Sequence, residues 1–200
     1  MNRIINYFLF MVVSMPLGFT QPIERDFYIM KGSQLMIHGE ANIHHFSCHL
    51  RNAFDSTPFK LRGVLEGKRI YLKVGRINFP VAKLDCGADA INKDMFDLLK
   101  AKEYPEITLD FLDFSAPEWK KTEKNLTSTA HAKINIILAG TSIPYFVHLD
   151  LIKINDGRIL LTGQKKLKMT DFKIKPKTYL FGLVKIKELI EVDFELILTK

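Results

Sequence analysis

The stretch LDCGADAINKDMFDLLKAKEYPEITLDF (residues 84–111) decides the fold, because it carries the one convincing helix of the chain between strand-like segments. Asn92 suits an N-cap, since its side chain can accept hydrogen bonds from the free amides of a first helical turn. Pro105 favours extended geometry in the residue before it, which ends the helix. The pattern predicts a short helix at about residues 92–102. Its apolar face follows at helical spacing: Met95, Leu98 and Leu99.

Strand-like alternation fills most of the remaining sequence. Over residues 190–198, large apolar side chains alternate with Glu191, Asp193 and Glu195, which gives one dry and one wet face. Asp156-Gly157 lies between two such runs and is a strong hairpin signal. About eight strands of this kind must cover or enclose their dry face, and closing the sheet also removes exposed edges. The pattern predicts an all-β, antiparallel barrel, with a two-sheet sandwich as the alternative.

The N-terminus has the features of a secretory signal. Arg3 precedes an apolar run that ends near Val13, and this run is shorter than the ~20 residues that a membrane-spanning helix needs. We therefore expect a cleaved signal peptide at residues 1–20, a lead-in segment at 21–31 and one barrel domain at 32–200. The expected location is periplasmic or extracellular.

Cys48 and Cys86 are the only cysteines, and the sequence holds no CxxC motif. Oxidising compartments favour disulfide formation, so export is consistent with a bond between them. Closing this loop would stabilise the fold by about 4 kcal/mol on the chain-entropy model. Two buried free thiols are the open alternative, because sequence does not give their separation.

The chain carries a formal net charge of +7. A positive field favours anionic headgroups, anionic membrane surfaces or nucleic acid. Export argues against nucleic acid as a partner. We therefore expect the positive charge to favour transient contact with an anionic membrane surface. A solvated basic surface is the simpler reading, and the sequence indicates no oligomeric state.

An ordered series of segments resembles the YceI-like family of secreted lipid-binding barrels. The short helix with its Leu-Leu pair and "YPEIT" exit (104–108) fits that family, as do the opening segment 32–48 and the closing segments 138–151, 156–176 and 181–198. The resemblance implies an eight-stranded lipocalin-like barrel. Its apolar tunnel would hold a polyisoprenoid or fatty amphiphile for carriage or sequestration. It implies no catalytic residue and no cofactor.

The resemblance also implies that inward-facing apolar residues line the tunnel, although ordinary core packing explains each of them equally well. Two lysines, Lys165 and Lys166, are candidates for contact with an anionic headgroup. The tunnel candidates are Ile37, Phe46, Leu72, Val74, Phe111, Ile134, Ile136, Phe146, Phe172 and Phe194.

Catalytic and metal-binding patterns are absent from the sequence. It contains no nucleophile elbow, phosphate loop, HExxH motif or dinucleotide fingerprint. The six histidines lack the spacing of a zinc site, so we expect neither an enzyme nor a metal protein. His131 and Asp150 are the first residues to test for a polar cluster inside the barrel. A filled barrel that acts as a secreted interaction or stress-response module is the alternative function.

Overall fold

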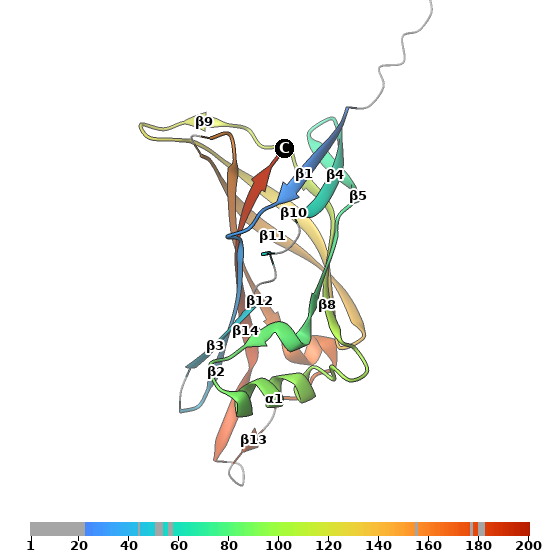
Figure 1. The fold of residues 1–200 in the computed structure, drawn as a ribbon, viewed down its shortest axis with the longest axis vertical. Helices are drawn as coiled ribbons and strands as arrows, with labels where there is room; N and C mark the ends of the chain where they lie inside the picture. Colours follow the sequence, from blue (N-terminus) through green and yellow to red (C-terminus); the bar gives the residue numbers. More distant parts are fainter. Residues whose placement is uncertain are drawn as a thin grey trace, which may run out of the picture.

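An antiparallel β-sheet dominates the computed structural model, which describes residues 23–43, 45–50, 54–55, 58–154, 156–176, 178–179 and 183–200 (Figure 1). Eight strands pair in a closed ring, because the first strand of the series also pairs with the last. The predicted all-β, eight-stranded architecture with one short helix is confirmed. In ring order the strands are β1 (Glu24–Ile29), β4 (Phe59–Glu66), β5 (Arg69–Val74), β8 (Glu106–Ser115), β10 (Leu126–Leu138), β11 (Thr141–Lys153), β12 (Ile159–Lys168) and β14 (Val184–Thr199).

Strand β14 belongs to two parts of the wall. Near its C-terminal end Leu198 pairs with Ile29 of β1, whereas its stretch from Ile186 to Glu195 pairs with β2. At the helix end of the barrel the wall therefore continues through β2 and its partners. The additional strands are β2 (Gln34–Ala41), β3 (His45–Leu50), β6 (Arg76–Pro80), β7 (Leu84–Asp85), β9 (Lys120–Lys121) and β13 (Thr178–Tyr179). Two short 3₁₀ helices are η1 (Val81–Lys83) and η2 (Met169–Phe172).

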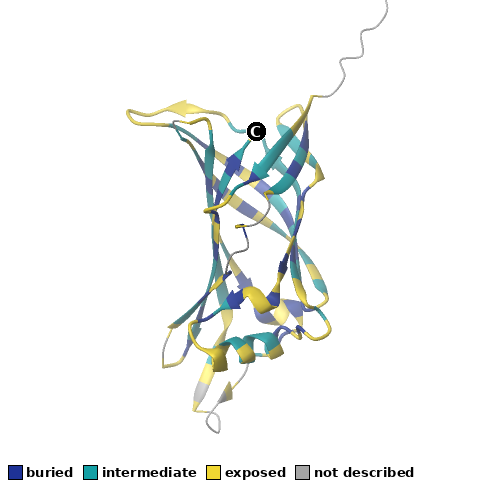
Figure 2. Ribbon diagram, in the orientation of Figure 1, coloured by how far each residue is buried: buried dark blue, intermediate teal, exposed yellow. Residues whose placement is uncertain are grey.

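The longest hairpin shows how the sequence builds the wall. Strands β10 and β11 pair along all 13 residues of each strand. Their two-residue turn is Ala139-Gly140, with φ of 47° and 75°, as a turn that matches the strand twist requires. Buried and exposed residues alternate along these strands (Figure 2). The inward side chains of β10 are Ala130, Ala132, Ile134, Ile136 and Leu138.

Helix α1 (Asp89–Leu98) crosses one end of the barrel (Figure 1). The predicted N-cap is wrong, because the helix begins after Ala88 and Asn92 lies inside it. The Asn92 carboxamide instead reaches back and accepts a hydrogen bond from the Cys86 amide at 2.6 Å. Among the described residues, no helix combines the length and the apolar character that crossing a bilayer demands.

The predicted lead-in segment, residues 21–31, contains β1 and so contributes a wall strand. The barrel therefore starts before residue 32, where the sequence placed the domain boundary. The predicted signal peptide, residues 1–20, lies outside the described residues and stays a prediction.

Asp26 joins β1 to β4 on the outer wall. Its carboxylate accepts hydrogen bonds from Arg62 Nε at 2.7 Å and from Lys60 Nζ at 2.8 Å. Arg62 and then Lys60 hold the Asp26 pKa well below its usual range. A lowered folded-state pKa contributes stability above the unfolded pKa, about 4, and that contribution is lost as the pH falls through the folded value.

We therefore expect Asp26→Asn to lower the melting temperature at pH 7 and to flatten its decline toward pH 3. Thermal unfolding across this range measures both effects. Glu123→Gln is the control, because it removes a carboxylate from an exposed position. A decline in Asp26→Asn as steep as that of the wild type would contradict the role assigned to this carboxylate.

Candidate functional site

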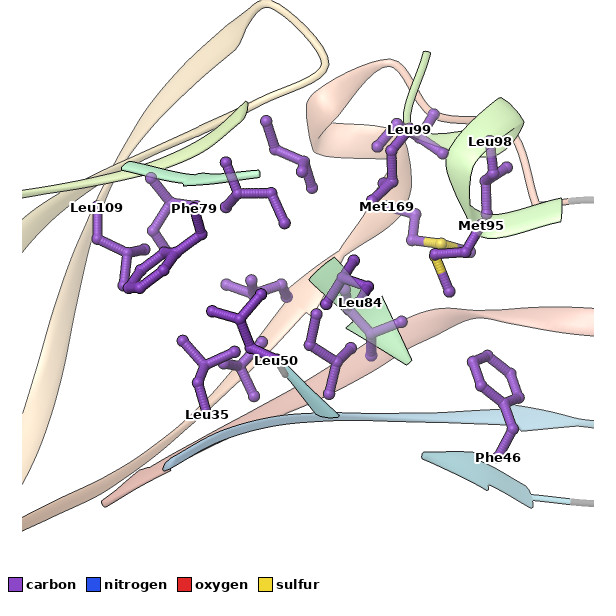
Figure 3. Close-up of a pocket in the computed structure, with 18 of the residues that line it drawn as sticks. Leu35, Phe46, Leu50, Phe79, Leu84, Met95, Leu98, Leu99, Leu109 and Met169 are labelled. Carbon is purple, nitrogen blue, oxygen red and sulfur yellow. The ribbon is translucent and has the colours of Figure 1, made fainter. Parts of the chain in front are cut away.

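The barrel interior holds an apolar cavity beneath α1, here called the helix chamber. Met95 and Leu98 of α1 and its C-cap residue Leu99 close it on one side, and side chains from the strands and from η2 form the other sides (Figure 3). Its lining contains no polar side chain, and about 70 Å³ is open to the centre of a water-sized sphere. One water molecule needs only ~10–15 Å³ by this measure, but it also needs polar partners. The chamber therefore suits a slim hydrocarbon.

A second apolar cavity, the C-terminal chamber, lies farther along the same strands. About 80 Å³ of it is open to the centre of a water-sized sphere. Ala130 and Ala132 of β10 make room for it, because their side chains are small. The other lining residues are all apolar: Phe27, Leu61, Ile70, Leu72, Phe111, Phe114, Pro117, Leu149, Leu151, Ile159, Leu161, Leu196 and Leu198.

The two chambers follow one another along the strands. On β14, Ile190 and Val192 line the helix chamber, whereas Leu196 and Leu198 line the C-terminal chamber. Phe194 faces the same side of the strand and lies between Val192 and Leu196. The Phe194 ring packs over Gly163 of β12, where an added Cβ would come within 2.3 Å of it. Side-chain alternation thus produces one apolar interior with a waist at the level of Phe194.

The interior is not filled like an ordinary core. Several inward side chains of the helix chamber, including Ile37, Leu109 and Val192, stay only partly buried although they pack against the buried cluster. Partial exposure of inward apolar residues means that a water-sized sphere still reaches them. This pattern favours an interior with free space over the filled barrel that was the alternative.

The structure places most predicted tunnel residues inside the barrel. Ile37, Phe46 and Ile136 line the helix chamber, and Leu72 and Phe111 line the C-terminal chamber. Three others belong to the interior without lining either chamber: Ile134 and Phe172, which are buried, and Phe194, which is partly buried. These residues come from six different strands and from η2.

Two predicted tunnel residues are corrections. Phe146 is 67% exposed, because the inward residues of β11 are its neighbours Tyr145 and Val147. Val74 is 43% exposed, and a register shift between Arg62 and Gly63 breaks the pairing of its strand with β4. A β-bulge of this kind changes which face a strand end presents.

The predicted headgroup lysines lie away from the lining of both chambers. Lys165 Nζ donates a hydrogen bond to the Phe146 carbonyl at 2.9 Å and lies 5.4 Å from the centre of the Tyr145 ring. Lys166 pairs with Glu191 at 3.5 Å. The structure thus gives both lysines partners in the wall.

A polar groove that sequence reasoning missed lies beside the C-terminal chamber. Backbone pairing between β8 and β10 ends at Phe114 and Ala132, and beyond it Ser128 Oγ donates to the Glu118 carbonyl at 3.0 Å. About 550 Å³ of the groove is open to the centre of a water-sized sphere. Leu151 lines both the groove and the chamber. Charged or titratable groove residues are Lys68, Glu118, Lys120, His131 and Asp150.

His131 and Asp150 lie on the outer wall and not inside the barrel. His131 Nε2 is 3.4 Å from His148 Nδ1, and His148 Nε2 is 3.5 Å from the Asp150 carboxylate. All three side chains face solvent. In the described part of the chain, no three His, Cys, Asp or Glu residues are grouped as metal ligands.

Cys48 of β3 and Cys86, two residues before the N-cap of α1, form a disulfide across 38 residues. Both cysteines are buried. Because β3 and β7 also pair beside it, the bond holds the start of α1 against the wall. This attachment fixes the helix that closes the helix chamber.

These features define a closed antiparallel β-barrel with an apolar interior that is capped by one helix. The sequence profile of the YceI-like domain matches residues 30–198. The chain belongs to the YceI-like family, as the sequence resemblance indicated. No curated protein matches the chain.

Two solved structures share the fold. A polyisoprenoid-binding domain from Saccharophagus degradans, implicated in plant cell wall breakdown, has a TM-score of 0.59 at 13% identity. The alignment covers 86% of this chain and 97% of that domain. BcnA from Burkholderia cenocepacia has a TM-score of 0.50 at 14% identity, with 84% of this chain and 96% of BcnA covered.

Proposed function

We propose that this protein binds the hydrocarbon tail of a polyisoprenoid or similar long-chain amphiphile inside its barrel. The observation that carries the proposal is the apolar interior, in which two dry chambers follow the same strands. The similarity to a polyisoprenoid-binding domain supports the choice of ligand class. The protein acts by binding and without a catalytic step.

Energetics favour carriage or sequestration over extraction. Burying ~500 Å² of hydrocarbon stabilises a complex by about 12 kcal/mol relative to water. Relative to a bilayer, where the tail is already dry, this gain almost vanishes, and ordering the tail costs free energy. Selectivity then comes from tunnel shape and from contacts with the polar end of the ligand.

The polar groove is the place we propose for that polar end. Leu151 lines both the groove and the C-terminal chamber, and Lys68 and Lys120 contribute cationic donors to the groove. Ammonium groups form charge-assisted hydrogen bonds with anionic headgroups. The groove also contains Glu118 and Asp150, so a polar headgroup of low net charge fits it as well.

The proposed carrier works in an exported compartment and contacts membrane surfaces transiently when it exchanges its ligand. The N-terminal sequence supports export, and the net charge of +7 supports attraction to anionic lipid.

Native mass spectrometry of the protein after expression with export, followed by organic extraction, tests the proposed function. We expect a discrete added mass that releases a prenyl or fatty amphiphile on extraction. A ligand-free mass that persists after incubation with prenols would overturn the proposal. It would direct attention to the interaction module with a filled barrel.

A further inference from the structure

The two chambers stay separate although the same strands line both. Along β14 the helix chamber extends from Ile186 to Val192, and the two chambers together extend from Ile186 to Leu198. At the usual strand rise these stretches measure about 20 Å and about 40 Å. Joining the chambers would therefore about double the length of tail that the interior can hold.

Three phenylalanine rings meet at the boundary between the chambers. The ring centroids of Phe54 lie 5.8 Å from Phe59 and 5.6 Å from Phe79, and Phe59 lies 5.7 Å from Phe79. All three pairs are edge-to-face, which is a favourable geometry for aromatic rings. Phe54 and Phe79 are buried in the barrel core.

The neighbours of this triad belong to different chambers. Phe79 itself lines the helix chamber. Phe59 precedes Leu61 by two residues on β4 and shares its face, and Leu61 lines the C-terminal chamber. Phe54 contacts both rings, so it lies where the two lining sets meet.

Phe54 differs from its two partners because it is not part of a wall strand. Phe59 belongs to β4 and Phe79 to β6, whereas Phe54 lies between the end of β3 at Leu50 and the start of β4. Phe54 is nevertheless only 4% exposed. Phe54 thus fills space inside the barrel although it is not part of any wall strand.

We infer that Phe54, held between Phe59 and Phe79, divides the apolar interior and sets the length of the hydrocarbon tail that the protein accepts. This inference rests on the proposed function and specifies its ligand class. The wild-type protein takes tails that fit one chamber. Longer tails have to displace the Phe54 ring or leave part of their length in water.

Binding of the short prenol farnesol and the long prenol solanesol to wild type, Phe54→Leu and Phe54→Ala tests this inference. We expect the wild type to favour farnesol by about tenfold or more, the scale on which apolar pockets discriminate by size. Phe54→Ala should reduce this preference to about threefold or less, mainly by tighter solanesol binding. Phe54→Leu keeps an apolar core residue if alanine prevents folding, and it should give an intermediate ratio.

Phe146→Ala is the matched control, because it removes a phenylalanine ring from the outer wall, where it is 67% exposed. It should leave the farnesol-to-solanesol ratio unchanged. An unchanged ratio in folded Phe54→Leu and Phe54→Ala, with both prenols bound, overturns the role of Phe54 and leaves the proposed function standing. Failure of the wild type to bind either prenol overturns both.

Discussion

Replacing Ile136 with tryptophan should abolish retention of a lipid whose tail lies in the helix chamber, while the barrel still folds. Ile136 lines the helix chamber from near the C-terminal end of β10, with Leu109 and Ile143 directly opposite on the flanking strands. Only about 70 Å³ is open to the centre of a water-sized sphere there, so an indole ring blocks the lumen. Overpacking costs about 1–3 kcal/mol, which a closed barrel of this size can tolerate. Native mass spectrometry should show loss of the added lipid mass, at least about tenfold.

Phe146→Trp provides the control for this substitution. It introduces the same indole on the neighbouring strand, at a side chain that faces solvent. Circular dichroism and thermal unfolding should show that both variants are folded. Full retention of ligand by folded Ile136→Trp would show that the tail does not occupy the helix chamber.

Removing the disulfide should have the largest effect on stability. The bond closes a loop of 38 residues, and constraining the unfolded chain over this length contributes about 4 kcal/mol. We therefore expect the double variant Cys48→Ala, Cys86→Ala to lose about 4 kcal/mol in free energy of unfolding. Urea denaturation of the wild type and the double variant measures this difference.

Reductant distinguishes the bond from the packing of the two side chains. It should lower the urea midpoint of the wild type and leave the double variant unchanged, since that variant has no cysteine. Because the bond anchors the start of α1, the double variant should also lose bound lipid faster. A wild type whose midpoint is indifferent to reductant would contradict the predicted contribution.

The alternation of the sequence predicts antiparallel strands with one dry face. The choice of a barrel over a two-sheet sandwich needed the family resemblance, and neither gave the details of the helix. In regular strands such as β10 and β14, every second residue faces the interior, so the sequence alone identifies the inward side chains. The start of α1 depends instead on tertiary contacts. Asn92 has the side chain of an N-cap, yet the neighbouring wall strand and disulfide place Cys86 where its amide becomes the partner of Asn92.

The candidate site was predictable where strands are regular and not where pairing breaks. Phe146 could have been excluded from the alternation of Val147, Leu149 and Leu151 along the same strand. Val74 could not, since the register shift that precedes it depends on pairing with β4. The phenylalanine at position 54 lies outside any periodic segment, so only three-dimensional contacts reveal its place in the interior.

The pairing of β1 with β14 has a consequence for how the molecule is made. Ile29 and Leu198 are partners in the ring, so the barrel cannot close until the ribosome has synthesised β14. Contacts this distant in sequence slow folding, because the entropy of closing a long loop must be lost before they form. The nascent chain therefore stays open during nearly all of its synthesis. An open chain is the form that can be threaded through a translocation channel, so this strand order is compatible with the proposed export.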